Sequence, residues 1–170
     1  MKSYILGIDQ STQGTKVLLF DDTGTICYKA AKSHKQYIDE KGWVEHDPDE
    51  IWRRLKDLVR DMLDKTDIDA RNIKAVGLSN QRETAMAWHR QTGKPVYRAI
   101  VWQCARGAAI CEELRRKGLD SLIKNTTGLP LSPYFSAAKL AWILRHVEGA
   151  GELMTEGSVW GPWTAGSSTV

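Results

Sequence analysis

The fold is indicated first by residues 4–20, which read YILGIDQSTQGTKVLLF. Residues 4–8 and 16–20 are continuous apolar runs, as expected of buried strands, and the polar stretch between them is typical of a turn. Residues 21–25 (Asp-Asp-Thr-Gly-Thr) are a second turn signal, and residues 26–34 then predict a third strand. We therefore expect the chain to begin with an antiparallel meander of three strands.

An amphipathic helix is expected next. Asp47 is a suitable N-cap, Pro48 occupies the first helical position and Glu50 stands where the acid of a capping box belongs. Apolar residues then repeat at helical spacing along one face, which comprises Ile51, Trp52, Leu55, Leu58, Val59, Met62 and Leu63. This face should pack on the sheet.

The remaining elements favour an α/β fold. Residues 74–79 are a short apolar run that follows a helix and should therefore lie parallel to the first strand. Residues 84–88 either pair with that run or form a hairpin that turns at residues 91–94. Helices are expected at residues 105–117, ended by Gly118, and at residues 136–147. The order β-β-β-α-β followed by a mostly helical insertion suits a ribonuclease-H-like mixed sheet covered by helices, as in the actin and sugar-kinase ATPases.

Composition excludes several classes of protein. The net charge of +3 comes from interspersed acids and bases, so there is no basic stripe of the kind that binds nucleic acid. The three cysteines, Cys27, Cys104 and Cys111, have no CxxC spacing, which argues against a disulfide framework or a zinc site. Residues 1–8 are too short an apolar start for a signal peptide, and no run approaches the length of a membrane span. We expect a cytoplasmic protein with free thiols.

The first candidate site is the turn from Asp9 to Lys16. A hairpin tip rich in Gly, Ser and Thr offers backbone N–H groups and hydroxyls to phosphate oxygens. An Asp at the end of a buried strand can hold Mg²⁺ through water, and Lys16 can neutralise phosphate charge. The same residues also suit a plain polar turn. The chain contains neither a P-loop nor a GxGxxG motif.

The second and third candidates suit a polyol. Arg82 and Glu83 follow the fourth strand, where α/β sheets gather their ligands, and they can donate to and accept from hydroxyl groups. Trp102 offers a flat apolar wall for a carbon chain, and Tyr134 adds a hydroxyl. The alternatives are a surface ion pair for Arg82 and Glu83, and core packing for the two aromatic residues.

Together these segments resemble the FGGY carbohydrate kinases. Residues 7–12 are similar to the opening phosphate loop of that family. The blocks that resemble its glycerol kinase branch are residues 77–84, 92–95, 100–104, 127–136 and 139–144. The resemblance extends from about residue 4 to about residue 154.

The resemblance implies the N-terminal part of an ATP-dependent kinase that converts glycerol to sn-glycerol 3-phosphate. The nucleotide-binding residues it implies are Ser11, Thr12, Gln13, Gly14 and Lys16, and Asp9 would face the Mg²⁺ ion through water. Arg82, Glu83 and Tyr134 would bind the glycerol hydroxyls, and Trp102 would wall the carbon chain. Lys16 stands where glycerol kinases often carry Arg, which keeps the charge but loses the bidentate fork. Residues 13–15 also depart from the more Ser/Thr-rich loop of those enzymes.

In the family, the aspartate that acts as the base, the adenosine pocket and the second phosphate loop come later than residue 170. We therefore expect the 170-residue chain to be inactive by itself. The full-length kinases of the family are usually homo-oligomers, but we make no prediction of the oligomeric state of this chain. The alternatives are part of a kinase for another polyol or ketose, and a non-catalytic binding module.

The last residues match no part of the family. At this point the family continues with a segment of the type Val-Asp-Ser-Trp-Leu-Val-Tyr. A DNA sequence that encodes this segment gives Trp-Thr-Ala-Gly-Ser-Ser-Thr when it is read one base later. That second peptide is identical to residues 163–169. The hypothesis is a frameshift near residue 160, with kinase sequence in residues 1–159 and an aberrant tail in residues 160–170. Genomic DNA tests this, because a shifted frame should restore kinase sequence downstream.

Overall fold

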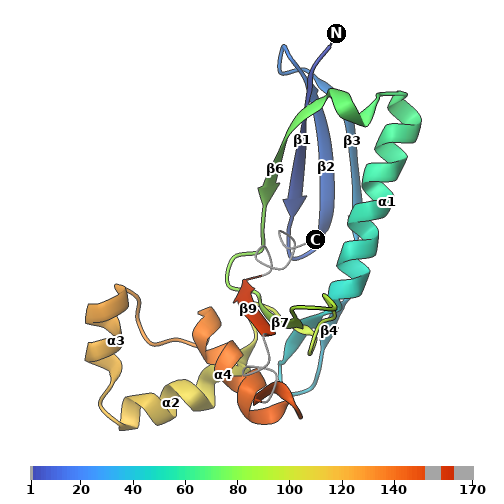
Figure 1. Cartoon of the computed structure of the whole chain (residues 1–170). Helices are drawn as coiled ribbons and strands as arrows, with labels where there is room; N and C mark the ends of the chain where they lie inside the picture. Colours follow the sequence, from blue (N-terminus) through green and yellow to red (C-terminus); the bar gives the residue numbers. More distant parts are fainter. Residues whose placement is uncertain (1, 152–157, 163–170) are drawn as a thin grey trace. The chain divides into compact units, whose positions relative to one another are not determined.

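The computed structural model describes residues 2–151 and the backbone of residues 158–162 (Figure 1). The chain divides into two compact units. Unit 1 comprises residues 1–35 and 47–81, and unit 2 comprises residues 36–46 and 82–170. Each unit has its own sheet and its own hydrophobic core.

Unit 1 contains a four-stranded sheet of order β3-β2-β1-β6. The strands β1 (Tyr4–Gln10), β2 (Gly14–Asp21) and β3 (Ile26–Ser33) form an antiparallel meander. The strand β6 (Ile73–Ser79) follows the 3₁₀ turn η1 (Ala70–Asn72) and pairs parallel to β1. The meander and the parallel fourth strand are confirmed.

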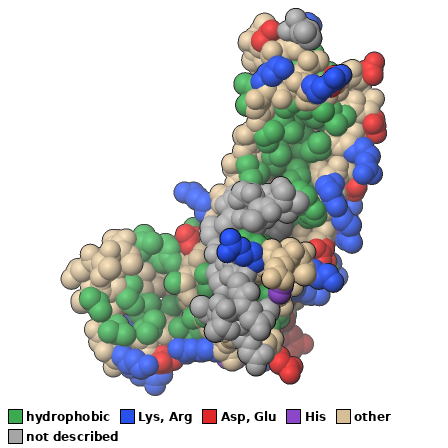
Figure 2. Space-filling view, viewed as in Figure 1, with side chains coloured by type: hydrophobic (Ala, Val, Ile, Leu, Met, Phe, Trp, Pro, Cys, Tyr) green, Lys and Arg blue, Asp and Glu red, His purple; other side chains and the backbone are tan. Residues whose placement is uncertain are grey.

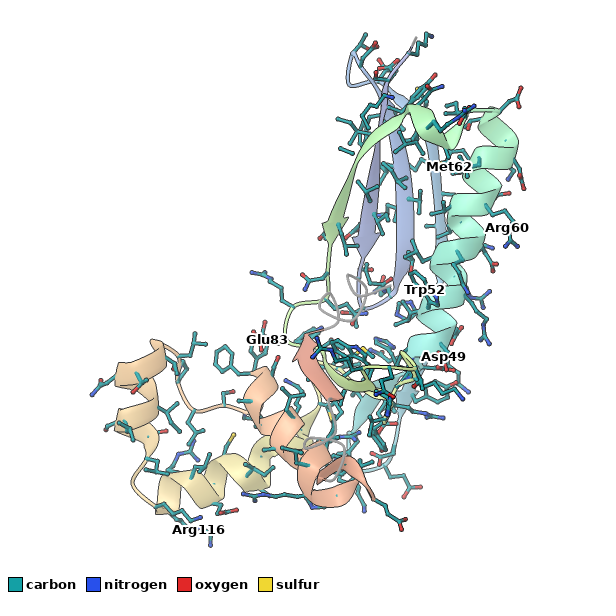
Figure 3. The ribbon with its side chains drawn as sticks, in the orientation of Figure 1. Asp49, Trp52, Arg60, Met62, Glu83 and Arg116 are labelled. Atoms are coloured by element: carbon teal, nitrogen blue, oxygen red, sulfur yellow. The ribbon has the colours of Figure 1, made fainter. Side chains whose placement is uncertain are left out.

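The helix α1 (Pro48–Thr66) covers part of this sheet. The Asp47 carboxylate accepts hydrogen bonds from the backbone N–H groups of Asp49 and Glu50, so the predicted N-cap is confirmed. The helix packs against β2 and β3, and Met62 turns toward the sheet while Arg60 points away (Figure 3). The core between them comprises Leu6, Val17, Leu19, Leu58 and Met62.

The edge strand β6 carries uncovered apolar side chains. Val76 pairs with Leu6 and Leu78 with Ile8, so both lie on the face of the sheet that bears α1. Because α1 packs over β2 and β3, Val76 and Leu78 stay 60% and 44% exposed. Figure 2 shows hydrophobic side chains gathered on this unit beside α1.

Unit 2 contains a second sheet, of order β4-β5-β8-β7-β9 with antiparallel pairs. Its strands are β4 (Gln36–Ile38), β5 (Val44–His46), β7 (Ala85–His89), β8 (Ala99–Ile100) and β9 (Ser158–Pro162). The described elements after β6 are mostly helical, as expected, but the second sheet was not predicted. Strands of two to five residues are too short to show a period in the sequence.

The hairpin alternative for residues 84–88 is the correct one. The strand β7 belongs to the second sheet, and the chain turns directly after it. Gly93 donates its N–H to the His89 carbonyl oxygen at 2.8 Å, and Trp88 bridges to Pro95.

The helices of unit 2 are close to those expected. The 3₁₀ turn η2 (Ala105–Gly107) leads into α2 (Ala108–Arg116), which Gly118 follows in a left-handed conformation. The helix α4 (Ser136–His146) also matches the prediction. The helix α3 (Asp120–Thr127) was not predicted, because its 8 residues are mostly exposed and carry little apolar pattern.

An arginine lies inside unit 2. The Arg106 side chain is 0% exposed, and its guanidinium group lies 4.6 Å from the ring centroids of both Trp43 and Trp142. It donates to the Glu45 carboxylate at 2.7 Å, as does the Tyr97 hydroxyl. Two of the seven tryptophans, Trp43 and Trp142, therefore pack around one buried cation.

The two cysteines in unit 2, Cys104 and Cys111, are buried free thiols, and Cys27 in unit 1 is an exposed one, which confirms the expected free thiols. No helix within the described ranges is long and apolar enough to cross a membrane. The start of the expected aberrant tail lies on β9, and residues 163–170 lie outside the described residues.

Candidate functional site

The geometry around Glu83 is unusual for a surface acid. Glu83 has a φ of 63°, the left-handed conformation, which costs a residue with a side chain about 1 kcal/mol. Its Oε2 accepts hydrogen bonds from the Ser136 backbone N–H at 2.7 Å and from the Ser136 hydroxyl at 2.8 Å. Figure 3 labels Glu83 ahead of β7. The carboxylate thus caps the first residue of α4, and both hydrogen bonds use one oxygen.

Two aromatic residues lie close to this capped helix start. The rings of Trp102 and Tyr134 meet edge to face, with their centroids 5.9 Å apart, and Tyr134 also contacts Phe135 at 5.2 Å. Trp102 is 36% exposed and Tyr134 is 42% exposed, so neither ring is core packing. They form an apolar wall that solvent can reach.

The remaining polyol candidate, Arg82, is exposed. Within the described part of the chain it forms no salt bridge with Glu83, so these two residues are not the surface ion pair considered as an alternative. The four polyol candidates, Arg82, Glu83, Trp102 and Tyr134, all lie in unit 2.

Sequence reasoning missed two residues of this region, Ser136 and Lys139. Lys139 is fully buried on α4, and its ammonium group donates to the backbone carbonyl oxygens of Tyr134 and Phe135. Burial lowers the pKa of Lys139 to about 8, and the nearby Glu83 carboxylate opposes this shift. A signal was present, because Lys139 precedes Trp142 and Ile143 by three and four residues and so shares their buried face.

The turn between β1 and β2 in unit 1 is tightly held. The Ser11 N–H and hydroxyl both donate to the Gly14 carbonyl oxygen, at 2.9 and 3.0 Å. The Thr15 hydroxyl donates to the Gln10 side-chain oxygen at 2.5 Å, and a ring nitrogen of His34 lies 3.1 Å from the Thr12 carbonyl oxygen. The tip formed by Thr12 and Gln13 is therefore preorganised, and its support from His34 was not predicted.

Gly14 is required by the close approach of the neighbouring strand. A Cβ atom at this position would lie 2.6 Å from the Lys32 carbonyl oxygen and 3.1 Å from the Ser33 Cα. Both contacts are backbone atoms of β3, which cannot turn aside as a side chain does. The sequence shows the glycine but not the strand that excludes a side chain from it.

Asp9 and Lys16 face each other across the β1–β2 pair. The Lys16 ammonium lies 3.6 Å from the Asp9 carboxylate, and the two side chains are 44% and 42% exposed. Among the residues that the structure describes, no cluster of three or more His, Cys, Asp or Glu side chains could hold a metal. Mg²⁺ is commonly held by one or two carboxylates with water and substrate phosphates, so Asp9 fits it as a single partner.

Comparison with known proteins identifies the family of the chain. The model of the FGGY family of carbohydrate kinases, N-terminal domain, matches residues 4–160. Glycerol kinase 1 of Thermotoga maritima is 48% identical over 156 residues, which is 92% of this chain and 32% of that protein. Glycerol kinase of Alkaliphilus metalliredigens is 45% identical, over 94% of this chain and 32% of that protein. The chain thus spans about a third of the length of these relatives.

Solved structures give the same picture. Plasmodium falciparum glycerol kinase with ADP is similar at a TM-score of 0.91 and 35% identity, over 97% of this chain and 33% of that chain. Gluconate kinase from Lactobacillus acidophilus, at a TM-score of 0.78 and 23% identity over 94% of this chain and 31% of that chain, shares the fold. The ribonuclease-H-like kinase fold expected from the sequence is confirmed, and the chain belongs to the FGGY family of carbohydrate kinases, whose N-terminal domain it carries.

Proposed function

We propose that this chain is the glycerol-binding part of an ATP-dependent glycerol kinase. The observation that carries the proposal is the exposed apolar wall of Trp102 and Tyr134, which lies beside the Glu83 carboxylate that caps α4. The names of the relatives at 45–48% identity support glycerol as the substrate.

A small polyol has a C–H side and a hydroxyl side, and this site offers a surface for each. The Trp102 and Tyr134 rings take the carbon chain, and Tyr134 adds its hydroxyl. Glu83 uses Oε2 within the protein, and in the described part of the chain Oε1 carries no hydrogen bond and is left to accept from a substrate hydroxyl. Arg82 is exposed and donates to hydroxyl oxygens. A site that hydrogen-bonds hydroxyls rejects analogues that lack them.

The turn of residues 9–16 is proposed to contact the ATP phosphates. Its supported tip presents Thr12, Gln13 and backbone N–H groups, and Lys16 neutralises charge. The ADP complex of the Plasmodium falciparum enzyme supports the nucleotide. Asp9 would hold Mg²⁺ through water, and the ion would supply charge stabilisation at the phosphates.

We further propose that the 170-residue chain alone has no kinase turnover. Phosphoryl transfer depends on positioning both substrates and on stabilising charge. The chain spans about a third of the length of its relatives, and the family resemblance implies that the base and the adenosine pocket lie in the rest. The free thiols suit a reducing compartment, which supports a cytoplasmic location.

Calorimetric titration of the chain with glycerol tests the binding proposal. Glu83→Gln and Arg82→Met should each weaken binding by about tenfold or more, since one charge-assisted hydrogen bond contributes roughly 1.5–3 kcal/mol. Arg116→Met is the matched control, because Arg116 is exposed on α2 and outside the proposed site (Figure 3).

Xylitol and xylulose, titrated in parallel, test a kinase for another polyol or ketose. Tighter binding of either than of glycerol would replace glycerol as the proposed substrate. A coupled assay for ADP release tests the absence of turnover, which glycerol-dependent release by the purified chain would contradict. Glycerol binding without turnover would leave the proposal standing, and absence of binding would overturn it.

A further inference from the structure

We propose that Lys139 is a positioning residue of the polyol site, holding the backbone before α4 so that Tyr134 and Glu83 face the substrate together. The inference rests on the proposed function, because it concerns the same site. Lys139 is fully buried, so it acts on the site through its neighbours.

The contacts of Lys139 converge on the segment that carries the site. Its ammonium group donates to the carbonyl oxygens of Tyr134 and Phe135, the second at 3.3 Å. The ammonium also lies 6.0 Å from the centroid of the Tyr134 ring. Because side chains on a helix lean toward its N-terminus, a lysine at the fourth residue of α4 reaches back to these carbonyls.

Glu83 binds the same segment by accepting hydrogen bonds from the segment's donor groups. Its carboxylate accepts from the N–H and hydroxyl of Ser136, while Lys139 donates to the two carbonyls immediately before Ser136. A half-buried anion and a buried cation thus hold the backbone of three consecutive residues between them. Phe135, the N-cap residue, offers no side-chain cap, so the Glu83 carboxylate supplies one, while Lys139 holds the carbonyls that precede the helix.

Stability alone does not explain a lysine at this position. The N-terminus of a helix carries partial positive charge, which disfavours a nearby cation. Burial disfavours the cation further, as the lowered pKa of Lys139 shows. A buried Met or Leu would avoid both penalties. The ammonium group at this position is therefore explained by its interactions with the carbonyl oxygens of Tyr134 and Phe135 and with the charge of Glu83.

The proposal makes the site sensitive to pH. The charged and titratable groups facing Lys139 are Glu83 from the segment before β7, Cys104 ahead of η2 and Cys111 on α2. Burial lowers the pKa of Lys139 to about 8, so the ammonium loses its charge just above neutral pH. Glycerol affinity should then fall as the pH rises through about 8, and Lys139→Met should show weak binding that does not vary with pH across this range.

The first experiment tests, without any ligand, whether Lys139 positions the segment that carries Tyr134 and Ser136. Two-dimensional NMR of the chain should show the Ser136 amide and the Tyr134 ring resonances shifted in Lys139→Met. Lys124→Met, on the exposed side of α3, is the matched control and should leave both unchanged. In wild type, both resonances should titrate with a midpoint near pH 8, which is measurable even if Lys139→Met does not fold. Unchanged resonances in a folded Lys139→Met, or no wild-type titration, would overturn the inference.

The second experiment measures glycerol affinity by calorimetry across the same pH range. Wild type should bind about tenfold more tightly than Lys139→Met at neutral pH, and the difference should shrink above pH 8. Equal affinities would overturn the inference while leaving the proposed function intact. Failure of wild type to bind glycerol at any pH would overturn the proposed function, and the NMR result would still decide whether Lys139 positions Tyr134.

Discussion

Replacing Lys139 by Met should remove one pH dependence from the stability of the chain. The pKa of Lys139 is about 8 in the folded protein because of burial, against 10.5 for an unperturbed lysine. Between these values the unfolded chain binds more protons than the folded one, so the free energy of unfolding rises with pH. Below pH 8 both states are protonated, and the penalty for burying the ammonium applies in full.

The size of the effect follows from the difference between the two pKa values. A separation of about 2.5 units, from 10.5 to about 8, corresponds to about 3 kcal/mol at 1.36 kcal/mol per unit. Wild type should gain this amount as the pH rises from about 8 to 10.5, with a slope of at most about 1.4 kcal/mol per pH unit. At neutral pH, Lys139→Met escapes the penalty but loses the two carbonyl hydrogen bonds, so the pH dependence is the cleaner quantity.

Other groups titrate in the same range and act in the opposite direction. Burial raises the pKa of Cys111, and the hydrogen bond to Asp61 raises the pKa of Tyr28 to about 12. A raised pKa gives stability that is lost at alkaline pH, since the unfolded state deprotonates first. The Tyr28 contribution is common to both proteins, whereas Cys111 lies near Lys139, so the difference curve, wild type minus Lys139→Met, reports Lys139 together with its coupling to Cys111.

Urea unfolding followed by tryptophan fluorescence, repeated over a series of pH values, measures this difference. The Trp43 and Trp142 rings report on unit 2, where Lys139 lies. A difference curve that stays flat from about pH 8 to 10.5 would refute the reasoning, because it would mean that Lys139 has an ordinary pKa.

Two further predictions concern each unit separately. Gly14→Ala should destabilise unit 1 by more than about 1 kcal/mol, since its Cβ would lie 2.6 Å from a backbone oxygen. Gly77→Ala on β6 is the control and should be nearly neutral, because its Cβ would meet nothing within 4 Å. Equal unfolding midpoints in urea for the two variants would contradict this prediction. Glu45→Gln should lower the free energy of unfolding by about 3 kcal/mol, because it leaves the buried Arg106 charge uncompensated. Glu112→Gln is the control, because Glu112 pairs with Arg115 on the surface, and it should lower the free energy of unfolding by less than about 1 kcal/mol. Similar losses of unfolding free energy in the two variants would show that the Arg106 charge is not buried in solution.

The sequence predicted unit 1 well because its signals are local and long. The β1–β2–β3 meander has two marked turns, and α1 has a cap, a proline and an apolar stripe in one segment. Unit 2 was predicted less well. Its strands are short and come from distant parts of the chain, so their pairing depends on tertiary contacts rather than on period.

The candidate site divides in the same way. Arg82, Glu83, Trp102 and Tyr134 could be nominated from their chemistry and from the family resemblance, and the structure adds their contacts. The role of Ser136 could not be deduced, because it depends on a loop meeting a helix 53 residues later. The burial of Lys139 did have a signal, in its spacing to Trp142 and Ile143, but the carbonyl oxygens that it contacts did not. The roles of these site residues stay predictions until ligand binding is measured.

The most direct test of the central claim is to map where glycerol binds on the chain. NMR titration with glycerol should shift the Trp102 indole resonance, the Tyr134 ring and the Glu83 and Ser136 amides, all in unit 2. The Trp102 signal is identified by its loss in Trp102→Phe. The account predicts saturable shifts confined to this cluster, which Glu83→Gln weakens. Shifts confined to other residues, or no saturable shift, would contradict it.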